Sequence, residues 1–108
     1  MANRNRQDQQ AHNRGVRHEA DELAGDDWNV RADHQPDNQY DEPPTVNGRV
    51  PDVYATKAGH TRIIEIETDP NDDHDQHTAF RRHAGQHENR VFYGWIVDAT
   101  GRRIQRFE

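Results

Sequence analysis

Three carboxylates that could share one metal ion stand in the stretch "RVPDVYATKAGHTRIIEIETD". Asp52 lies near the start of a predicted strand at about 49–56. Glu65 and Glu67 lie two residues apart at the end of a second predicted strand, at about 62–68. The short Gly-containing segment "KAGH" between the strands predicts a hairpin turn. Such a hairpin would bring Asp52 toward the two glutamates.

The alternation of side chains along a strand decides which of these residues share a face. Glu65 and Glu67 then lie on one face of the strand. Ile64 and Ile66 lie on the other face and would anchor the strand in the core. We therefore expect the carboxylates to face a cleft or solvent.

Crowded carboxylates repel one another, and the repulsion raises the pKa of some of them. A bound Mg²⁺ or Mn²⁺ would remove the repulsion, because these ions prefer oxygen ligands. Such an ion could also promote phosphodiester cleavage. The alternative interpretation is a solvated acidic face that binds nothing.

The order and spacing of these residues resemble those of the PD-(D/E)XK nuclease superfamily. "PD" is followed by twelve residues and then by "EIE", and "RGVRHE" upstream looks like the start of the first helix of that superfamily. The chain is most similar to archaeal Holliday junction resolvases and related restriction-endonuclease-like folds, over about residues 14–70. The resemblance implies an αβββαβ core and Mg²⁺- or Mn²⁺-dependent hydrolysis of DNA, with branched DNA as one candidate substrate. It also implies that Glu19, Asp52 and Glu65 are the metal ligands.

One residue departs from the superfamily pattern: the motif ends in Lys, and this chain has Glu67. The resemblance makes Asp52, Glu65 and Glu67 the catalytic group, with Glu67 as a ligand or as the general base for water. Lys57, the only lysine, is a candidate substitute for the missing amine, although strand alternation points it away from Asp52. Gln76 is a second candidate helper, and a capping box with Asp73 explains it equally well. A degenerate domain of the same fold that binds nucleic acid or a protein partner is the rival interpretation.

Other polar residues could support DNA binding. Arginines are the natural phosphate contacts, and the candidates are Arg49, Arg62, Arg81 and Arg82. The formal net charge of -6 argues against strong general DNA binding. The chain has eight histidines, which are best explained as polar surface residues because no zinc motif is present.

The surrounding pattern predicts an α/β domain with a small mixed sheet and a helix on each side. Residues 1–12 are predicted to be a disordered polar tail, and residues 13–108 a single domain. The expected elements are a helix at 13–25, a strand at 28–32, a flexible loop at about 33–48, the two strands described above, a helix in "DQHTAFRRHAGQ", a strand in "RVFYGWIVD" and a last strand in "RRIQRFE".

The composition restricts the class of protein. The chain has 108 residues, of which 30% are hydrophobic, so the core must be thin and a homodimer is expected. There is no cysteine, no apolar run long enough for a membrane span and no secretory signal, so a cytoplasmic location is expected. Twenty acidic residues and a single lysine among fourteen basic residues are typical of extreme halophiles. An ordinary acidic domain is the alternative.

Overall fold

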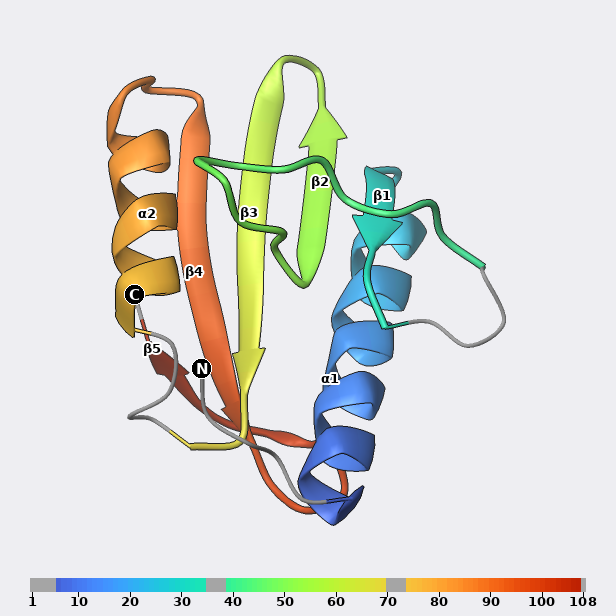
Figure 1. The fold of residues 1–108 in the computed structure, drawn as a ribbon. Helices are drawn as coiled ribbons and strands as arrows, with labels where there is room; N and C mark the ends of the chain where they lie inside the picture. Colours follow the sequence, from blue (N-terminus) through green and yellow to red (C-terminus); the bar gives the residue numbers. More distant parts are fainter. Residues whose placement is uncertain (1–5, 35–38, 70–73, 108) are drawn as a thin grey trace.

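The computed structural model describes residues 6–34, 39–69 and 74–107. They form an α/β fold in which a five-stranded mixed sheet is covered by one helix on each face (Figure 1). This confirms the predicted fold class, and one further strand follows the predicted αβββαβ order. The elements are α1 (Arg6–Gly25), β1 (Asn29–Ala32), β2 (Val53–Lys57), β3 (His60–Glu67), α2 (His74–Gly85), β4 (Arg90–Val97) and β5 (Arg103–Phe107).

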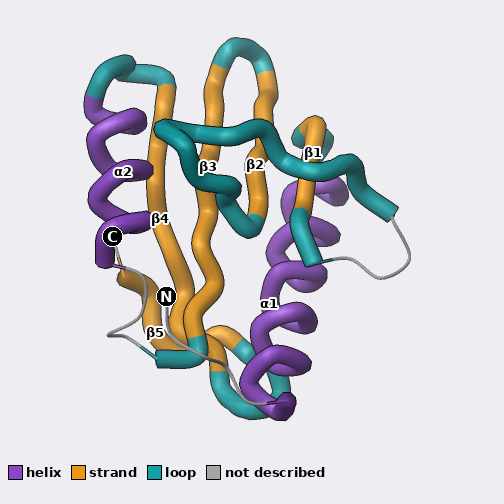
Figure 2. Tube along the Cα trace, in the orientation of Figure 1, coloured by secondary structure: helices purple, strands orange, loops and turns teal. Residues whose placement is uncertain are grey.

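The strands lie in the sheet in the same order as in the chain (Figure 2). All neighbouring strands are antiparallel except β3 and β4, which are parallel. A parallel pair needs a crossover connection, and α2 provides it. Strand β3 is therefore central, and its side chains reach both covered faces of the sheet.

Alternation along β3 divides the core into two layers. Ile64 and Ile66 pack with Val16 of α1. Ile63 points to the other face and packs with Phe80 of α2. The two helices thus cover opposite faces, and every odd-numbered side chain at this end of β3 lies on the α2 side.

Helix α1 is longer than the sequence predicted. Residues 6–12, which were expected to belong to a disordered tail, form its first turns, and Ala11 and His12 are completely buried. Gln9 also donates a hydrogen bond of 2.8 Å from its side-chain amide to Asn13, one turn later. Packing against the sheet outweighs the polar composition that suggested disorder. Residues 1–5 lie outside the described part of the chain.

Glycine allows α1 to approach the sheet closely. A Cβ added to Gly15 would lie 2.8 Å from Ile66 Cγ2 and 3.1 Å from Val97 Cγ1. Both distances are shorter than ordinary van der Waals contacts. Because Gly15 is one turn after His12, this close contact also sets the distance of His12 from the end of β3.

The hairpin between β2 and β3 has a two-residue turn. Lys57 pairs with His60, and the two residues between them, Ala58 and Gly59, have φ values of 50° and 84°. Positive φ at both central positions is the signature of a type I′ turn, whose twist suits a hairpin. The predicted hairpin is therefore confirmed.

Strand β2 begins later than the sequence predicted, at Val53 rather than near residue 49. Pro51 has no N–H to donate to a neighbouring strand, and the N–H of Asp52 donates to a side chain instead. The predicted loop at 33–48 contains neither helix nor strand in its described part, apart from one bridge between Val46 and Arg49. Asp73, the predicted helix cap, lies outside the described residues.

A candidate metal centre where three strands meet

Two carboxylates are tied together where β2 begins and β3 ends. The N–H of Asp52 donates to Glu65 Oε2 over 2.8 Å, and the N–H of Ile66 donates to Asp52 Oδ2 over 2.8 Å. Gln76 of α2 donates to Glu65 Oε1 over 2.5 Å. Asp52 and Glu65 are both buried. The proximity of Asp52 to Glu65 that the sequence predicted is therefore present.

Two histidines bracket the Asp52 carboxylate. His12 Nε2 lies 3.0 Å from Asp52 Oδ2, and His34 Nε2 lies 3.7 Å from Asp52 Oδ1. The two imidazole rings meet edge to face, with their centroids 4.9 Å apart. One ligand atom from each of the three residues lies within 4.8 Å of the others, so the group could hold a metal ion. His34 is exposed, and it follows β1, so the group opens to solvent on that side.

The orientation of His12 is fixed by its neighbours. Asn13 Oδ1 accepts a hydrogen bond from Gln9 Nε2, and it lies 3.2 Å from His12 Nδ1. Nδ1 therefore carries a hydrogen and donates it to the same oxygen. The other nitrogen, Nε2, faces Asp52. In the protonated ring it can donate to Asp52, and in the neutral ring its lone pair could bind a metal ion, the proton having left to water.

A second group lies on the α2 side of the sheet. Glu67 Oε1 lies 3.2 Å from His77 Nε2, and Glu65 completes a set of three ligand atoms within 4.8 Å of one another. The His77 ring packs against Phe107, with centroids 4.8 Å apart. Glu65 and Glu67 are each only 1% exposed. The prediction that they face a cleft or solvent is wrong, because α2 and Phe107 cover this face.

Burial and neighbouring charges shift the pKa values of the two tied carboxylates in opposite directions. Burial raises the pKa of Glu65 well above its ordinary value, and the charges of Asp52 and Glu67 raise it further. Burial also acts to raise the pKa of Asp52, but the charge and hydrogen bond of His12 and the N–H of Ile66 outweigh it, so that pKa is lowered. The pair therefore keeps its negative charge mainly on Asp52, next to the two histidines.

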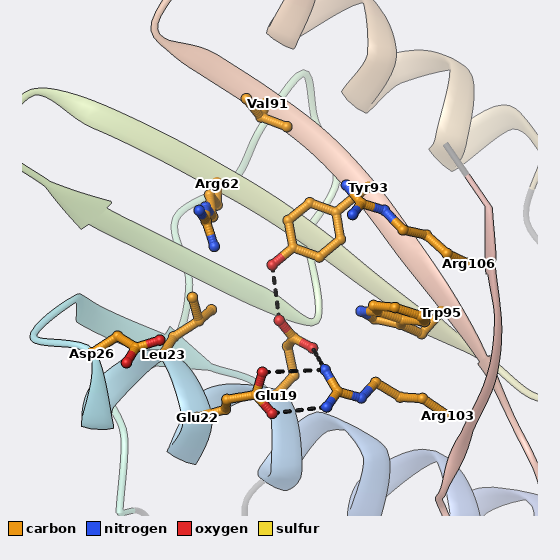
Figure 3. A pocket seen from close by; sticks show the side chains of 10 residues that line it. All are labelled: Glu19, Glu22, Leu23, Asp26, Arg62, Val91, Tyr93, Trp95, Arg103 and Arg106. Atoms are coloured by element: carbon orange, nitrogen blue, oxygen red, sulfur yellow. Dashed lines mark hydrogen bonds and ion pairs between the residues drawn. The ribbon is translucent and has the colours of Figure 1, made fainter.

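Glu19 does not belong to this centre. Its carboxylate accepts a hydrogen bond from the Tyr93 hydroxyl over 2.8 Å and forms an ion pair with Arg103 over 3.2 Å (Figure 3). His12, seven residues earlier in α1, is the residue of this helix that reaches Asp52. Two helical turns, about 10 Å, separate the two positions. The predicted ligand set of Glu19, Asp52 and Glu65 is therefore wrong in its first member.

The two candidate helpers have different positions. Gln76 lies in the centre, hydrogen-bonded to Glu65. Lys57 lies at the other end of β2, and its Nζ donates to the carbonyl of Asp26 after α1. Lys57 therefore does not supply the amine that the superfamily motif has in place of Glu67.

The four candidate DNA-binding arginines do not share one face. Arg62 lies on the α1 side of the sheet, with its guanidinium 4.4 Å from the Trp28 ring centroid. Arg81 and Arg82 are exposed on α2, and Arg49 is exposed in the loop before β2. DNA binding by these residues stays a prediction.

The sequence interpretation missed three histidines, two in the Asp52 centre and one in the second group. His12 was assigned to the tail, His34 to a loop and His77 to the polar surface. One signal for His12 was available: it lies four residues before Val16, so it extends the buried stripe of α1 by one step. No comparable signal marks His34.

Comparison of the chain with protein-family models, curated proteins and solved structures finds no match. The resemblance to the nuclease superfamily therefore depends on the quoted residues alone. Among the described residues, no helix has the length and apolar character needed to cross a membrane.

Proposed function

We propose that the protein is a metal-dependent nuclease that hydrolyses DNA phosphodiester bonds at the Asp52 centre. The observation that carries the proposal is the position of Asp52, which lies between two imidazoles and is tied to Glu65. In the described part of the chain, neither Asp52 nor Glu65 pairs with an arginine or lysine. A divalent ion is therefore the natural partner for their negative charge.

The donor set favours Mn²⁺ over Mg²⁺. His12, His34 and Asp52 would hold the ion, and imidazole nitrogen suits a transition metal better than Mg²⁺, which prefers oxygen ligands alone. When bound, the ion offsets negative charge on the phosphodiester and makes water a better nucleophile. Glu65 shapes the centre from the side of β3, because its two oxygens are held by Asp52 and Gln76.

Glu67 takes the place of the usual lysine in this proposal. Its carboxylate lies 3.2 Å from His77 Nε2, which can donate a hydrogen bond to it, so Glu67 is a proton acceptor oriented by His77. We propose that Glu67 receives the proton of the attacking water and that His77 holds the carboxylate in position. In this proposal Glu67 acts as a general base at the position where the superfamily motif has a positively charged lysine.

The alternative function is a catalytically degenerate domain of the same fold that binds nucleic acid or a protein partner. The depth of Glu65 and Glu67 favours it, because each side chain is only 1% exposed. In either case the proposed partner is DNA or another macromolecule in the cytoplasm, and a homodimer is part of the same proposal.

A cleavage assay tests the proposal. Wild type, Asp52→Asn and the control Asp27→Asn are incubated in molar KCl with Mn²⁺ or Mg²⁺ and with linear, branched or single-stranded DNA. Asp27 is a suitable control because it is exposed, far from the centre, and has a φ of 69°, which asparagine adopts readily. We expect cleavage by wild type and Asp27→Asn, faster with Mn²⁺, and none by Asp52→Asn.

The same three proteins are melted with and without Mn²⁺, because an ion that binds only the folded state raises the melting temperature. A rise in wild type that disappears in Asp52→Asn, together with absence of cleavage on every DNA, would support the metal centre but reject nuclease activity, and would favour the alternative function. Absence of both the rise and the cleavage in wild type would reject the metal centre itself.

A further inference from the structure

A groove lies on the α1 side of the sheet, opposite the face that carries Glu65 and Glu67. Its volume is about 290 Å³, and side chains from α1, β3, β4 and β5 line it (Figure 3). The floor is formed by Tyr93 and Trp95, which point to the same face of β4. The groove is open because α1 packs chiefly against β1, and Val91 at one end is 46% exposed.

Arginine side chains from β5 cover this floor. The guanidinium carbon of Arg106 lies 4.5 Å from the Tyr93 ring centroid, and that of Arg103 lies 5.0 Å from the Trp95 ring centroid. Stacked guanidinium groups of this kind present a second planar, cationic surface above the aromatic one.

Arg103 is held and neutralised by two carboxylates. Its nitrogens lie 3.2 Å from Glu19 and 2.8 Å from Glu22. The result is a planar guanidinium fixed over Trp95, in a group of three side chains whose formal charges sum to -1. A group in this state is a platform on which another planar ring can stack.

Two other arginines keep their charge available. Arg62 and Arg106 lie on either side of Tyr93 (Figure 3), on the two strands that flank β4. In the described part of the chain, neither of them pairs with a carboxylate. The lining holds three acids and three arginines, so its formal net charge is zero. Attraction of a phosphate therefore depends on the local positive charge of Arg62 and Arg106, which flank Tyr93.

One hydrogen-bond donor of the groove also lacks an acceptor. The indole N–H of Trp95 is buried and has no hydrogen-bond partner among the described residues. In Figure 3 this nitrogen is turned toward the interior of the groove. A buried donor without an acceptor costs about 1–3 kcal/mol.

We propose that this groove binds a nucleotide. Arg62 and Arg106 take the phosphate, and the base stacks on the guanidinium of Arg103, which itself lies over the Trp95 ring. The volume suits a single nucleotide. The ligand is either a free nucleotide or one unpaired nucleotide of a DNA strand, since both present the same chemistry. Glu19 of the groove lies two helical turns along α1 from His12 of the Asp52 centre, and the groove lining shares no residue with that centre. The site is therefore distinct from the one proposed for nuclease activity.

Tryptophan fluorescence gives a direct test, because Trp28 and Trp95 are the only tryptophans. The Trp28→Phe protein, which reports on Trp95 alone, is titrated in EDTA with dTMP, thymidine, inorganic phosphate and an oligothymidylate of about eight nucleotides. We expect saturable quenching by dTMP. Thymidine and phosphate should bind at least about tenfold more weakly, because each lacks one half of the contacts.

Arg106→Gln and the control Arg102→Gln are then compared in the same background. Arg102 is exposed and lies outside the groove lining. Arg106→Gln should raise the Kd for dTMP at least about tenfold, and Arg102→Gln should leave it unchanged. An oligonucleotide that binds more tightly than dTMP identifies a DNA strand as the ligand, and equal binding identifies a free nucleotide.

Three results would each overturn the proposal: no saturable quenching by dTMP at millimolar concentrations, equal affinity of Arg106→Gln and Arg102→Gln, or phosphate binding as tight as that of dTMP. Asp52→Asn should bind dTMP as wild type does. Failure of the nuclease proposal and failure of the nucleotide site are thereby distinguishable.

Discussion

The two histidines beside Asp52 determine which partners this carboxylate can have. His12 is completely buried, and the side chain of His34 is 38% exposed, so the two imidazoles meet Asp52 from the inside and from the solvent side. Imidazole is the one side chain that can serve a buried carboxylate either as a cation or as a neutral fellow ligand. The same three residues can therefore exist as an ion pair without metal and as a ligand set with it.

Substitution of Glu19 separates structure from metal binding at the scale of a residue. Glu19→Gln removes a buried charge that Tyr93 and Arg103 both contact. We expect a loss of about 1–3 kcal/mol in the free energy of unfolding, measured by urea denaturation. The increase in melting temperature caused by Mn²⁺ should not change, because Glu19 lies outside the centre.

Glu88→Gln is the matched control, since Glu88 is exposed after α2, and it should leave both measurements unaltered. Loss of the Mn²⁺ effect in Glu19→Gln alone would show that Glu19 is a metal ligand after all, as the superfamily resemblance had implied.

The elements show how far sequence patterns could predict the site. Alternation around Ile64 and Ile66 correctly placed Glu65 and Glu67 on one face, and the "KAGH" turn correctly brought Asp52 toward them. The pattern could not reveal that α2 buries this face, because the covering depends on the packing of a distant segment. It also could not place the start of α1, since packing of Ala11 and His12 on the sheet, and not their local composition, makes that turn helical.

The hairpin turn holds one residue, Ala58, in a disfavoured backbone conformation that a substitution can relieve. Ala58 has a φ of 50°, a region in which alanine is disfavoured and asparagine is common. Ala58→Asn should raise the free energy of unfolding by roughly 0.5–1 kcal/mol, because Asn-Gly is the preferred pair for this turn. Chemical denaturation measures the change. Ala99→Asn, in the exposed turn before β5, is the control and should have little effect on the free energy of unfolding. A gain for Ala99→Asn larger than that for Ala58→Asn would contradict the explanation by the positive φ of Ala58.

The contact between α1 and β3 links packing to the metal centre. Gly15→Ala places a methyl group too close to Ile66 and Val97, and we expect it to cost about 1–3 kcal/mol of unfolding free energy. It should also weaken Mn²⁺ binding, measured as the increase in melting temperature, because α1 would carry His12 away from Asp52. Gly25→Ala has no atom within 4 Å of the added carbon and should be neutral or stabilising. If Gly15→Ala leaves both quantities unchanged, the helix is not held at this distance by the glycine.

At the scale of the whole molecule, charge dominates. The net charge of -6 on 108 residues is a source of repulsion in dilute buffer, and at roughly 1 M salt the Debye length falls to about 3 Å. We expect the melting temperature to rise as KCl increases from dilute to molar. Melts in NaCl at the same ionic strengths provide the comparison, and a melting temperature that is flat or falls in both salts would contradict adaptation to brine.

The order in which the chain assembles follows from the short hairpin. Asp52 and Glu65 are thirteen residues apart and are joined by the two-residue turn, so their strands can meet within microseconds. Strand β4 can pair with β3 only after the connection through α2 has formed. The contacts of α1 with β3 join residues much further apart in the sequence, so we expect them to form later. We therefore expect the two acids to become neighbours before His12 reaches them. In refolding kinetics, Ala58→Asn should therefore accelerate folding, whereas Gly15→Ala should mainly accelerate unfolding. The reverse pattern would mean that helix docking comes first.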